Sequence, residues 1–203
     1  MNPKLKSLLE ILAIILLFAL SSYLVRQNID FLKSVIGNDF GIFFYILIAI
    51  FAVVVAPISM MPLIPLASNI FGWLSAAVFS IVGWTIGSFI VFFISRKYGV
   101  PLIKKFVSLE KLEKLENKIP KENLFLDLIL LRMIIPVDIL SYAISLFTKI
   151  NFRTYALTTI IGIIPFAFVF SYLGTIPLKY QIIGILIAIF IIGVISEFHK
   201  KLK

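Results

Sequence analysis

Two residues of opposite charge lie within one long apolar segment of the chain, where charged side chains are costly. Arg132 and Asp138 flank Pro136, and Ser141 follows Asp138 by three residues. An opposite pair on the two arms of a broken helix can form an internal ion pair that braces the break, or it can take part in handling a substrate or protons. The sequence leaves both roles open, and one pair can fill both.

The guanidinium of Arg132 is suited to phosphate, because its planar fork offers two parallel N–H donors. The N-termini of broken half-helices add partial positive charge, which also favours anions. An anionic phospholipid or a polyprenyl phosphate headgroup would therefore suit this segment. Lys149 and Arg153 follow it in the chain, and they either attract the same headgroup or serve as ordinary basic anchors on the cytoplasmic side.

A second apolar segment is also broken by prolines, and it contains Ser68 and Asn69 after the last of them, Pro65. Polar side chains at such a place can cap the ends of the broken helix. The candidates for a substrate or ion pathway are therefore Arg132, Asp138, Pro136, Ser141 and Asn69.

The residue types that most enzymes need are scarce. The chain has no cysteine and one histidine, His199, which excludes thiolate metal sites and the common His-rich metal and triad chemistries. No nucleophile with an adjacent base and no pair of carboxylates is visible. We therefore expect no catalytic residue, no metal and no cofactor, and we do not expect an enzyme.

The composition is that of an integral membrane protein. Apolar residues make up 61% of the 203 residues and charged residues 14%, with a mean hydropathy of +1.11. A soluble domain has about 45–50% apolar residues and about 25% charged residues. A globular protein of this size cannot bury so large an apolar surface. The net charge of +9 comes from residues placed as membrane anchors, so no nucleic-acid partner is expected.

The apolar segments predict one all-α membrane domain over residues 1–203. Four segments suit simple transmembrane helices, at residues 8–25, 71–95, 152–173 and 181–198. The segments 41–70 and 124–149 are broken by proline, and each is either a kinked transmembrane helix or a re-entrant hairpin. Residues 104–121 predict an amphipathic helix on the cytoplasmic surface.

The positions of the basic residues favour hairpins, because cytoplasmic loops carry the excess of Lys and Arg. If residues 41–70 crossed the membrane fully, the eight basic residues of the central loop would lie outside. With two hairpins, fifteen of the nineteen basic residues lie inside, Arg26, Lys33 and Lys179 lie outside, and Arg132 lies within a hairpin. Both termini are then cytoplasmic, and the first apolar segment is an uncleaved span rather than a signal peptide.

A hairpin followed by a helix then occurs twice, entered once from each side of the membrane. Gly87 and Gly162 lie 75 residues apart and Pro62 and Pro136 lie 74 apart. Inverted repeats of this kind are a recurrent transporter architecture, so we predict an inverted repeat with additional N- and C-terminal transmembrane helices. Gly83 and Gly87 form a GxxxG motif, which favours packing within the chain over a homo-oligomer.

The motifs of the two halves occur in a recognisable order. The first half contains Pro62-Leu-Ile-Pro65 and then Ser68-Asn69-Ile-Phe71-Gly72-Trp73. The second contains Arg132-x-x-x-Pro136-Val-Asp138-Ile-Leu-Ser141-Tyr142-Ala143 and then Phe152-Arg153-x-Tyr155. Together they resemble the DedA superfamily, most closely its VTT branch, also called SNARE-associated Golgi proteins, over about residues 41–174.

This resemblance implies an inner-membrane protein with two opposed re-entrant hairpins and a link to lipid translocation. Arg132 and Asp138 match the charged motif of the second hairpin, and Arg153 matches a basic residue after it. The DedA-type members thought to use proton coupling carry acidic residues in and just before the first hairpin. This chain has no carboxylate between Phe40 and Ser95, which argues against proton coupling.

We therefore expect a lipid transporter, a flippase or scramblase that moves phospholipid or polyprenyl phosphate between the leaflets of the inner membrane. Its partners would be membrane lipids, with anionic headgroups favoured. Two alternatives remain open: a proton- or ion-linked carrier of small anions, and a membrane factor that supports assembly without transport.

Overall fold

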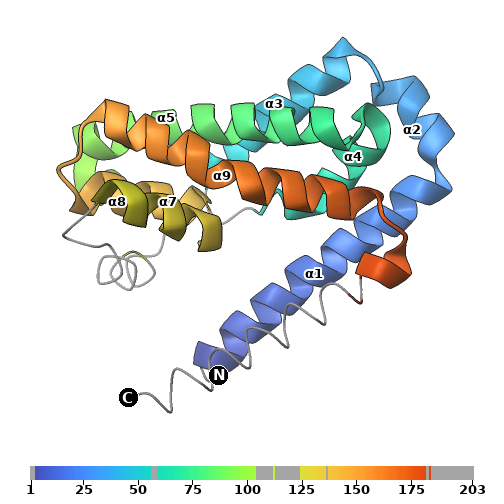
Figure 1. Cartoon of the computed structure of the whole chain (residues 1–203), viewed down its shortest axis with the longest axis horizontal. Helices are drawn as coiled ribbons and strands as arrows, with labels where there is room; N and C mark the ends of the chain where they lie inside the picture. Colours follow the sequence, from blue (N-terminus) through green and yellow to red (C-terminus); the bar gives the residue numbers. More distant parts are fainter. Residues whose placement is uncertain are drawn as a thin grey trace.

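The protein is helical throughout most of the residues that the structure, a computed structural model, describes; these are 3–55, 59–103, 112, 124–135, 137–181 and 183. The helices, shown in Figure 1, are α1 (Pro3–Gln27), α2 (Ile29–Ile36), α3 (Asp39–Val54), α4 (Ile64–Phe71), α5 (Trp73–Ile103), α7 (Leu124–Ile134), α8 (Val137–Phe147) and α9 (Phe152–Thr175). A short 3₁₀ turn, Met61–Leu63, precedes α4. The predicted all-α class is confirmed. The helix expected over 104–121, apart from residue 112, and the span expected over 181–198, apart from residues 181 and 183, lie outside the described residues.

Two of the described helices, α5 and α9, are long and apolar enough to cross a membrane by themselves. They pack against each other through the middle of the molecule (Figure 1). α1 and α2 together make a third candidate, with a bend of 89° between them. These findings confirm the predicted membrane class.

Two helices differ from the sequence prediction. α5 runs to Ile103, beyond the expected end at Ser95, because its kink at Gly99, where φ is 61°, lets the helical path resume over Pro101. Residues 26–40, which lie between the predicted segments 8–25 and 41–70, contain α2. The apolar pattern of α2 covers only eight residues and includes Asp30 and Lys33, so the sequence alone does not predict this helix.

The arms of the two broken segments pack on the long helices in a reciprocal way. α3 packs along α5, and α7 packs along α9. The second arms exchange partners, because α4 packs on α9 while α8 packs on α5. Figure 1 shows α7 and α8 at one end of α9 and α4 near the other end.

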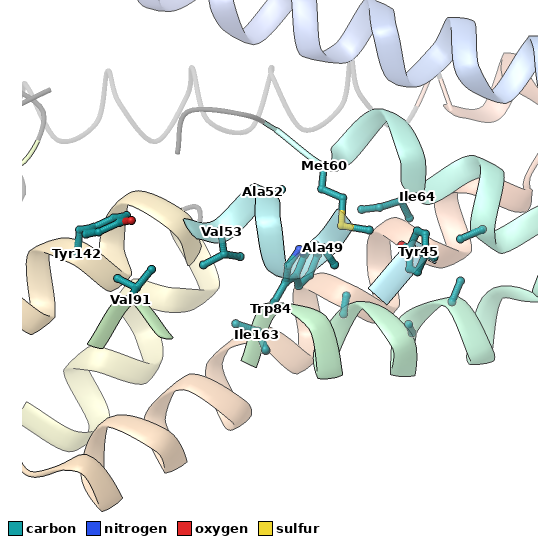
Figure 2. Packing of buried hydrophobic residues seen from close by; sticks show 14 of the residues in the cluster. Tyr45, Ala49, Ala52, Val53, Met60, Ile64, Trp84, Val91, Tyr142 and Ile163 are labelled. Carbon is teal, nitrogen blue, oxygen red and sulfur yellow. The ribbon is translucent and has the colours of Figure 1, made fainter. Parts of the chain in front are cut away.

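Small residues allow the helices of the core to approach closely. A Cβ on Gly83 would lie 2.4 Å from the Cβ of Ala49, so α3 and α5 meet almost backbone to backbone. Around this contact Figure 2 shows Val53, Trp84 and Ile163, which come from α3, α5 and α9. The GxxxG motif therefore packs within the chain, as membrane helices do when dispersion rather than water exclusion drives association.

Gly72 forms the sharp turn between α4 and α5. Its φ of 85° and ψ of 148° belong to a region that essentially only glycine adopts. A Cβ there would meet no atom within 4 Å, so the cost of a side chain is conformational. We expect Gly72→Ala to lower the free energy of unfolding by about 1–3 kcal/mol, measured by thermal unfolding in detergent. Ser75→Ala is the control, and equal stability of the two variants would show that the turn is not strained.

Candidate functional site

Arg132 is buried in the last turn of α7, with 2% of its surface exposed. Its guanidinium carbon lies 4.9 Å from the centre of the Tyr155 ring on α9, within the range of a cation–π contact. Nη1 donates a hydrogen bond of 3.2 Å to the Ser141 hydroxyl on α8. Three helices therefore each supply one group to a single polar centre.

Two hydrogen bonds hold this centre to the long helix α5. The Ser141 hydroxyl lies 3.1 Å from the Ser88 hydroxyl, and it also bonds to the Val137 carbonyl one turn earlier on α8. The Tyr155 hydroxyl donates to the Ser88 carbonyl at 3.0 Å. Both groups that touch the guanidinium are thus fixed by the same residue of α5.

Two nitrogen atoms of the guanidinium remain open. Nε and Nη2 of Arg132 are buried, and neither has a hydrogen-bond partner among the described residues. They form one edge of the planar group, which presents two parallel N–H donors to a carboxylate or phosphate. A buried donor without a partner costs about 1–3 kcal/mol, and more if it is charged. The open edge has the chemistry of an oxyanion site.

A close contact between α7 and α9 fixes the distance between Arg132 and α9. A Cβ on Gly162 would lie 2.6 Å from the Cβ of Arg132 and 3.1 Å from the carbonyl oxygen of Ile129. No side chain larger than hydrogen fits between the two helices at this point without moving one of them.

The other half of the molecule contains a matching contact. A Cβ on Gly87 would lie 2.8 Å from the Cβ of Val53 and 2.9 Å from the carbonyl oxygen of Ile50. In both halves the glycine meets a carbonyl at one residue and a Cβ three residues later. Val53 therefore holds the position on α3 that Arg132 holds on α7, and only the second half carries a charge there.

Asp138 lies in the first turn of α8 and is half-buried. It precedes Ser141 by one turn, and Ser141 is the side chain that accepts the Arg132 hydrogen bond. The ion pair between Arg132 and Asp138 stays a prediction. Pro136, which we predicted as part of the site, lies outside the described residues.

Asn69 lies at the other end of α9. Its Nδ2 donates to the Pro65 carbonyl at 2.7 Å and to the Gly174 carbonyl at 2.8 Å. Gly174 is twelve residues from Gly162, which is about 18 Å along a helix. The structure therefore does not bring Asn69 together with Arg132.

The last carbonyls at this end of α9 are held by side chains from α1 and from the segment after α9. Arg26 Nη2 donates to the carbonyls of Thr175 at 2.6 Å and Ile176 at 2.5 Å. Gln181 Nε2 donates to the Ser22 hydroxyl at 2.7 Å and to the Ile176 carbonyl at 2.9 Å. Because a helix C-terminus carries unpaired carbonyls and partial negative charge, a cation stabilises it.

We expect Arg26→Gln to lower the free energy of unfolding by about 1.5–3 kcal/mol, because the variant loses charge-assisted hydrogen bonds to two carbonyls. Thermal unfolding in detergent measures the loss. Lys33→Gln, at an exposed position of α2, is the matched control and should unfold like the unaltered protein. If both variants unfold at the same temperature, the contacts of Arg26 contribute nothing to stability.

Lys149 and Arg153 are exposed beside the turn between α8 and α9. Arg96 of α5 reaches the same turn, because its Nη2 donates to the Ile150 carbonyl at 3.0 Å while its guanidinium lies over the Phe92 ring. These basic residues lie at the start of α9, the end of that helix near which Arg132 contacts Tyr155.

Residues 56–176 match the model of the VTT domain family, a stretch that covers more than half of the chain. The chain belongs to the VTT (DedA) family. No curated protein and no solved structure matches the chain.

The VTT domain contains every group of the Arg132 centre, because α5, α7, α8 and α9 all fall within its limits. Helices α1, α2 and α3 precede it. Arg26 is therefore an addition from outside the VTT domain that caps one of its helices.

Two residues of the Arg132 centre, Ser88 and Tyr155, are not among the functional residues predicted from the sequence. Ser88 follows Gly87 in a long apolar helix, and its serine type was the one available signal. Tyr155 was noted only as part of a motif. Sequence spacing does not reveal either contact, because each depends on how α5 and α9 pack across α7 and α8.

Proposed function

We propose that this VTT protein moves lipids with phosphate headgroups between the two leaflets, as a flippase or scramblase. The observation that carries the proposal is Arg132, buried in a membrane protein with the Nε–Nη2 edge of its guanidinium unpartnered among the described residues. Charged side chains inside membrane proteins are costly and mark substrate or ion pathways.

The geometry around Arg132 favours a phosphate over a single-point ligand. The Tyr155 ring and the Ser141 hydroxyl hold the guanidinium plane in one orientation. An arginine held in this way loses less side-chain entropy when it binds a two-oxygen group. A phospholipid and a polyprenyl phosphate share that group, and both leave an acyl or prenyl tail that hydrocarbon can accept.

The reciprocal packing of the helices supports an inverted repeat of hairpin plus helix. α3 on α5 corresponds to α7 on α9, and α4 on α9 corresponds to α8 on α5. The contacts of Gly87 and Gly162 have the same spacing. In transporters with inverted repeats, the substrate site lies near the repeat interface, and Arg132 lies where α7 and α8 meet both long helices.

Lys149 and Arg153, together with Arg96, support a cytoplasmic location for the Arg132 end of α9. In this arrangement the protein is a multi-pass protein of the inner membrane with both termini in the cytoplasm. The exposed basic groups would concentrate anionic headgroups near the site, since each basic residue near an anionic surface contributes about 1 kcal/mol.

The proposal is tested with purified protein in vesicles and quenchable fluorescent lipids of four kinds. These are phosphatidylglycerol, phosphatidylcholine, a short polyprenyl phosphate, and a glycosylated diacylglycerol without phosphate. We expect an external quencher to reach inner-leaflet lipid for the phosphate lipids and not for the neutral glycolipid. Parallel vesicles measure uptake of free inorganic phosphate.

Movement of the neutral glycolipid at the same rate would contradict recognition of phosphate at Arg132. Uptake of free phosphate without movement of any lipid would replace the proposal by a carrier of small anions. If the folded protein moves neither lipids nor free phosphate, the proposal is wrong and a non-transporting assembly factor is favoured.

A further inference from the structure

The short helix α2 has defined ends. At its start, the Asn28 side chain donates to the Leu24 carbonyl at 3.0 Å, which pairs a group that the end of α1 leaves free. At its end, the backbone N–H of Gly37 donates to the Lys33 carbonyl, and the Asn38 side chain then caps α3. α2 therefore lies between two breaks, and at these breaks side chains pair the end of α1 and the start of α3.

α2 is amphipathic, and its polar and apolar residues separate cleanly around the axis. At 100° per residue, Asp30, Lys33 and Ser34 occupy one arc and the apolar residues occupy the opposite one. Within the apolar arc, Ile29, Leu32 and Ile36 are half-buried, and α2 packs against α4 and α3.

The rest of the apolar arc is open. Phe31 is 67% exposed and Val35 is 54% exposed. The apolar surface continues onto the first turns of α3, where Phe40 and Phe43 are 71% and 59% exposed and the Phe40 ring packs on Phe44.

The direction of α2 differs from that of the helix before it. α2 turns by 89° from α1 (Figure 1). If α1 crosses the bilayer, α2 runs along the membrane plane. α2 contacts α4, which packs near the Gly174 end of α9, away from the basic residues at the start of α9. One Lys and one Asp on its polar arc leave that side suited to water and headgroups.

We propose that α2 is an interfacial helix that lies on the bilayer surface opposite the basic end of α9, with Phe31 and Val35 inserted among the lipids. The occupant of its open apolar face is the lipid bilayer. An amphipathic helix in this position buries its apolar side about 5–10 Å into the boundary between headgroups and acyl chains. The Phe residues of α3 continue the same lipid contact toward the hydrocarbon core.

The absence of cysteine from the chain allows single-cysteine variants in an otherwise unaltered protein. Spin labels are attached to Phe31→Cys, Val35→Cys, Lys33→Cys and Ser34→Cys in phosphatidylcholine and phosphatidylglycerol vesicles. Collision with oxygen, which is enriched in lipid, is compared with collision with a water-soluble nickel chelate. Val78→Cys, at an exposed position of the spanning helix α5, supplies the reference for lipid contact.

We expect the oxygen-to-nickel ratio at 31 and 35 to exceed that at 33 and 34 by about tenfold, as an interfacial helix with one immersed face requires. Equal nickel access at all four positions would place α2 in water and overturn the proposal. Equal oxygen access at all four would place α2 inside the hydrocarbon, as part of a broken span. Low access of both reagents at 31 and 35 would show that protein, such as a second copy, covers the face. None of these outcomes depends on whether the protein moves lipids.

Discussion

Replacing Arg132 by glutamine or methionine is expected to lower lipid translocation by at least about tenfold, a loss of ~1.4 kcal/mol in the transition state, while the unfolding temperature stays the same or rises. The guanidinium is buried with an open edge, and desolvating an unpaired charge costs several kcal/mol. Replacing Arg132 therefore removes the desolvation cost of the guanidinium. It also removes the group that binds the phosphate of the lipid.

The stability measurement separates this role from a structural one. If Arg132 only braced the break by pairing with Asp138, its removal would leave a half-buried carboxylate without its cation and lower the unfolding temperature. Arg132→Lys keeps the charge but loses the planar fork, so we expect it to translocate poorly as well. Translocation by Arg132→Lys at the rate of the unaltered protein would contradict two-point binding. Arg26→Gln is the matched control for translocation, because it removes an arginine at the other end of α9. We expect it to translocate like the unaltered protein at temperatures below its unfolding.

Replacing Gly162 by alanine is expected to lower both stability and translocation. The added Cβ would lie 2.6 Å from the Cβ of Arg132, so α7 must move away from α9. Overpacking of this kind costs about 1–3 kcal/mol. The movement also shifts Arg132 relative to Tyr155 and Ser141, whose contacts hold the guanidinium plane.

Gly87→Ala supplies a matched control from the other half of the molecule. Its Cβ would lie 2.8 Å from the Cβ of Val53, so the steric conflict is similar but no charged residue is displaced. We expect comparable loss of stability in detergent and a smaller loss of translocation, each measured below the lower unfolding temperature. If the two variants translocate equally, the position of Arg132 does not control transport.

Much of the architecture followed from local sequence. α3 and α4 are separate helices on either side of Pro57 and Pro62, and α7 ends before Pro136, because proline removes a backbone donor and clashes with the preceding turn. The short helix α2 and the last turns of α5 were missed, because charged residues or proline interrupt the apolar pattern there.

The candidate site was predictable only in part. Arg132 and Ser141 were chosen from their type and position in an apolar segment, and the structure joins them by a hydrogen bond. Asn69 was chosen by the same reasoning, but the structure places it at the opposite end of α9, on the Gly174 carbonyl. Polarity within an apolar segment identifies groups that need partners but not the partners themselves.

The sequence by itself determined the membrane class, the helical breaks and the family, since each depends on composition or on residues close together in the chain. Only the tertiary structure decided that Arg132 meets Tyr155 and Ser141, and that Arg26 caps α9. These contacts depend on how closely the helices approach, and the approach is set by glycines such as Gly162 that leave no side chain between two backbones.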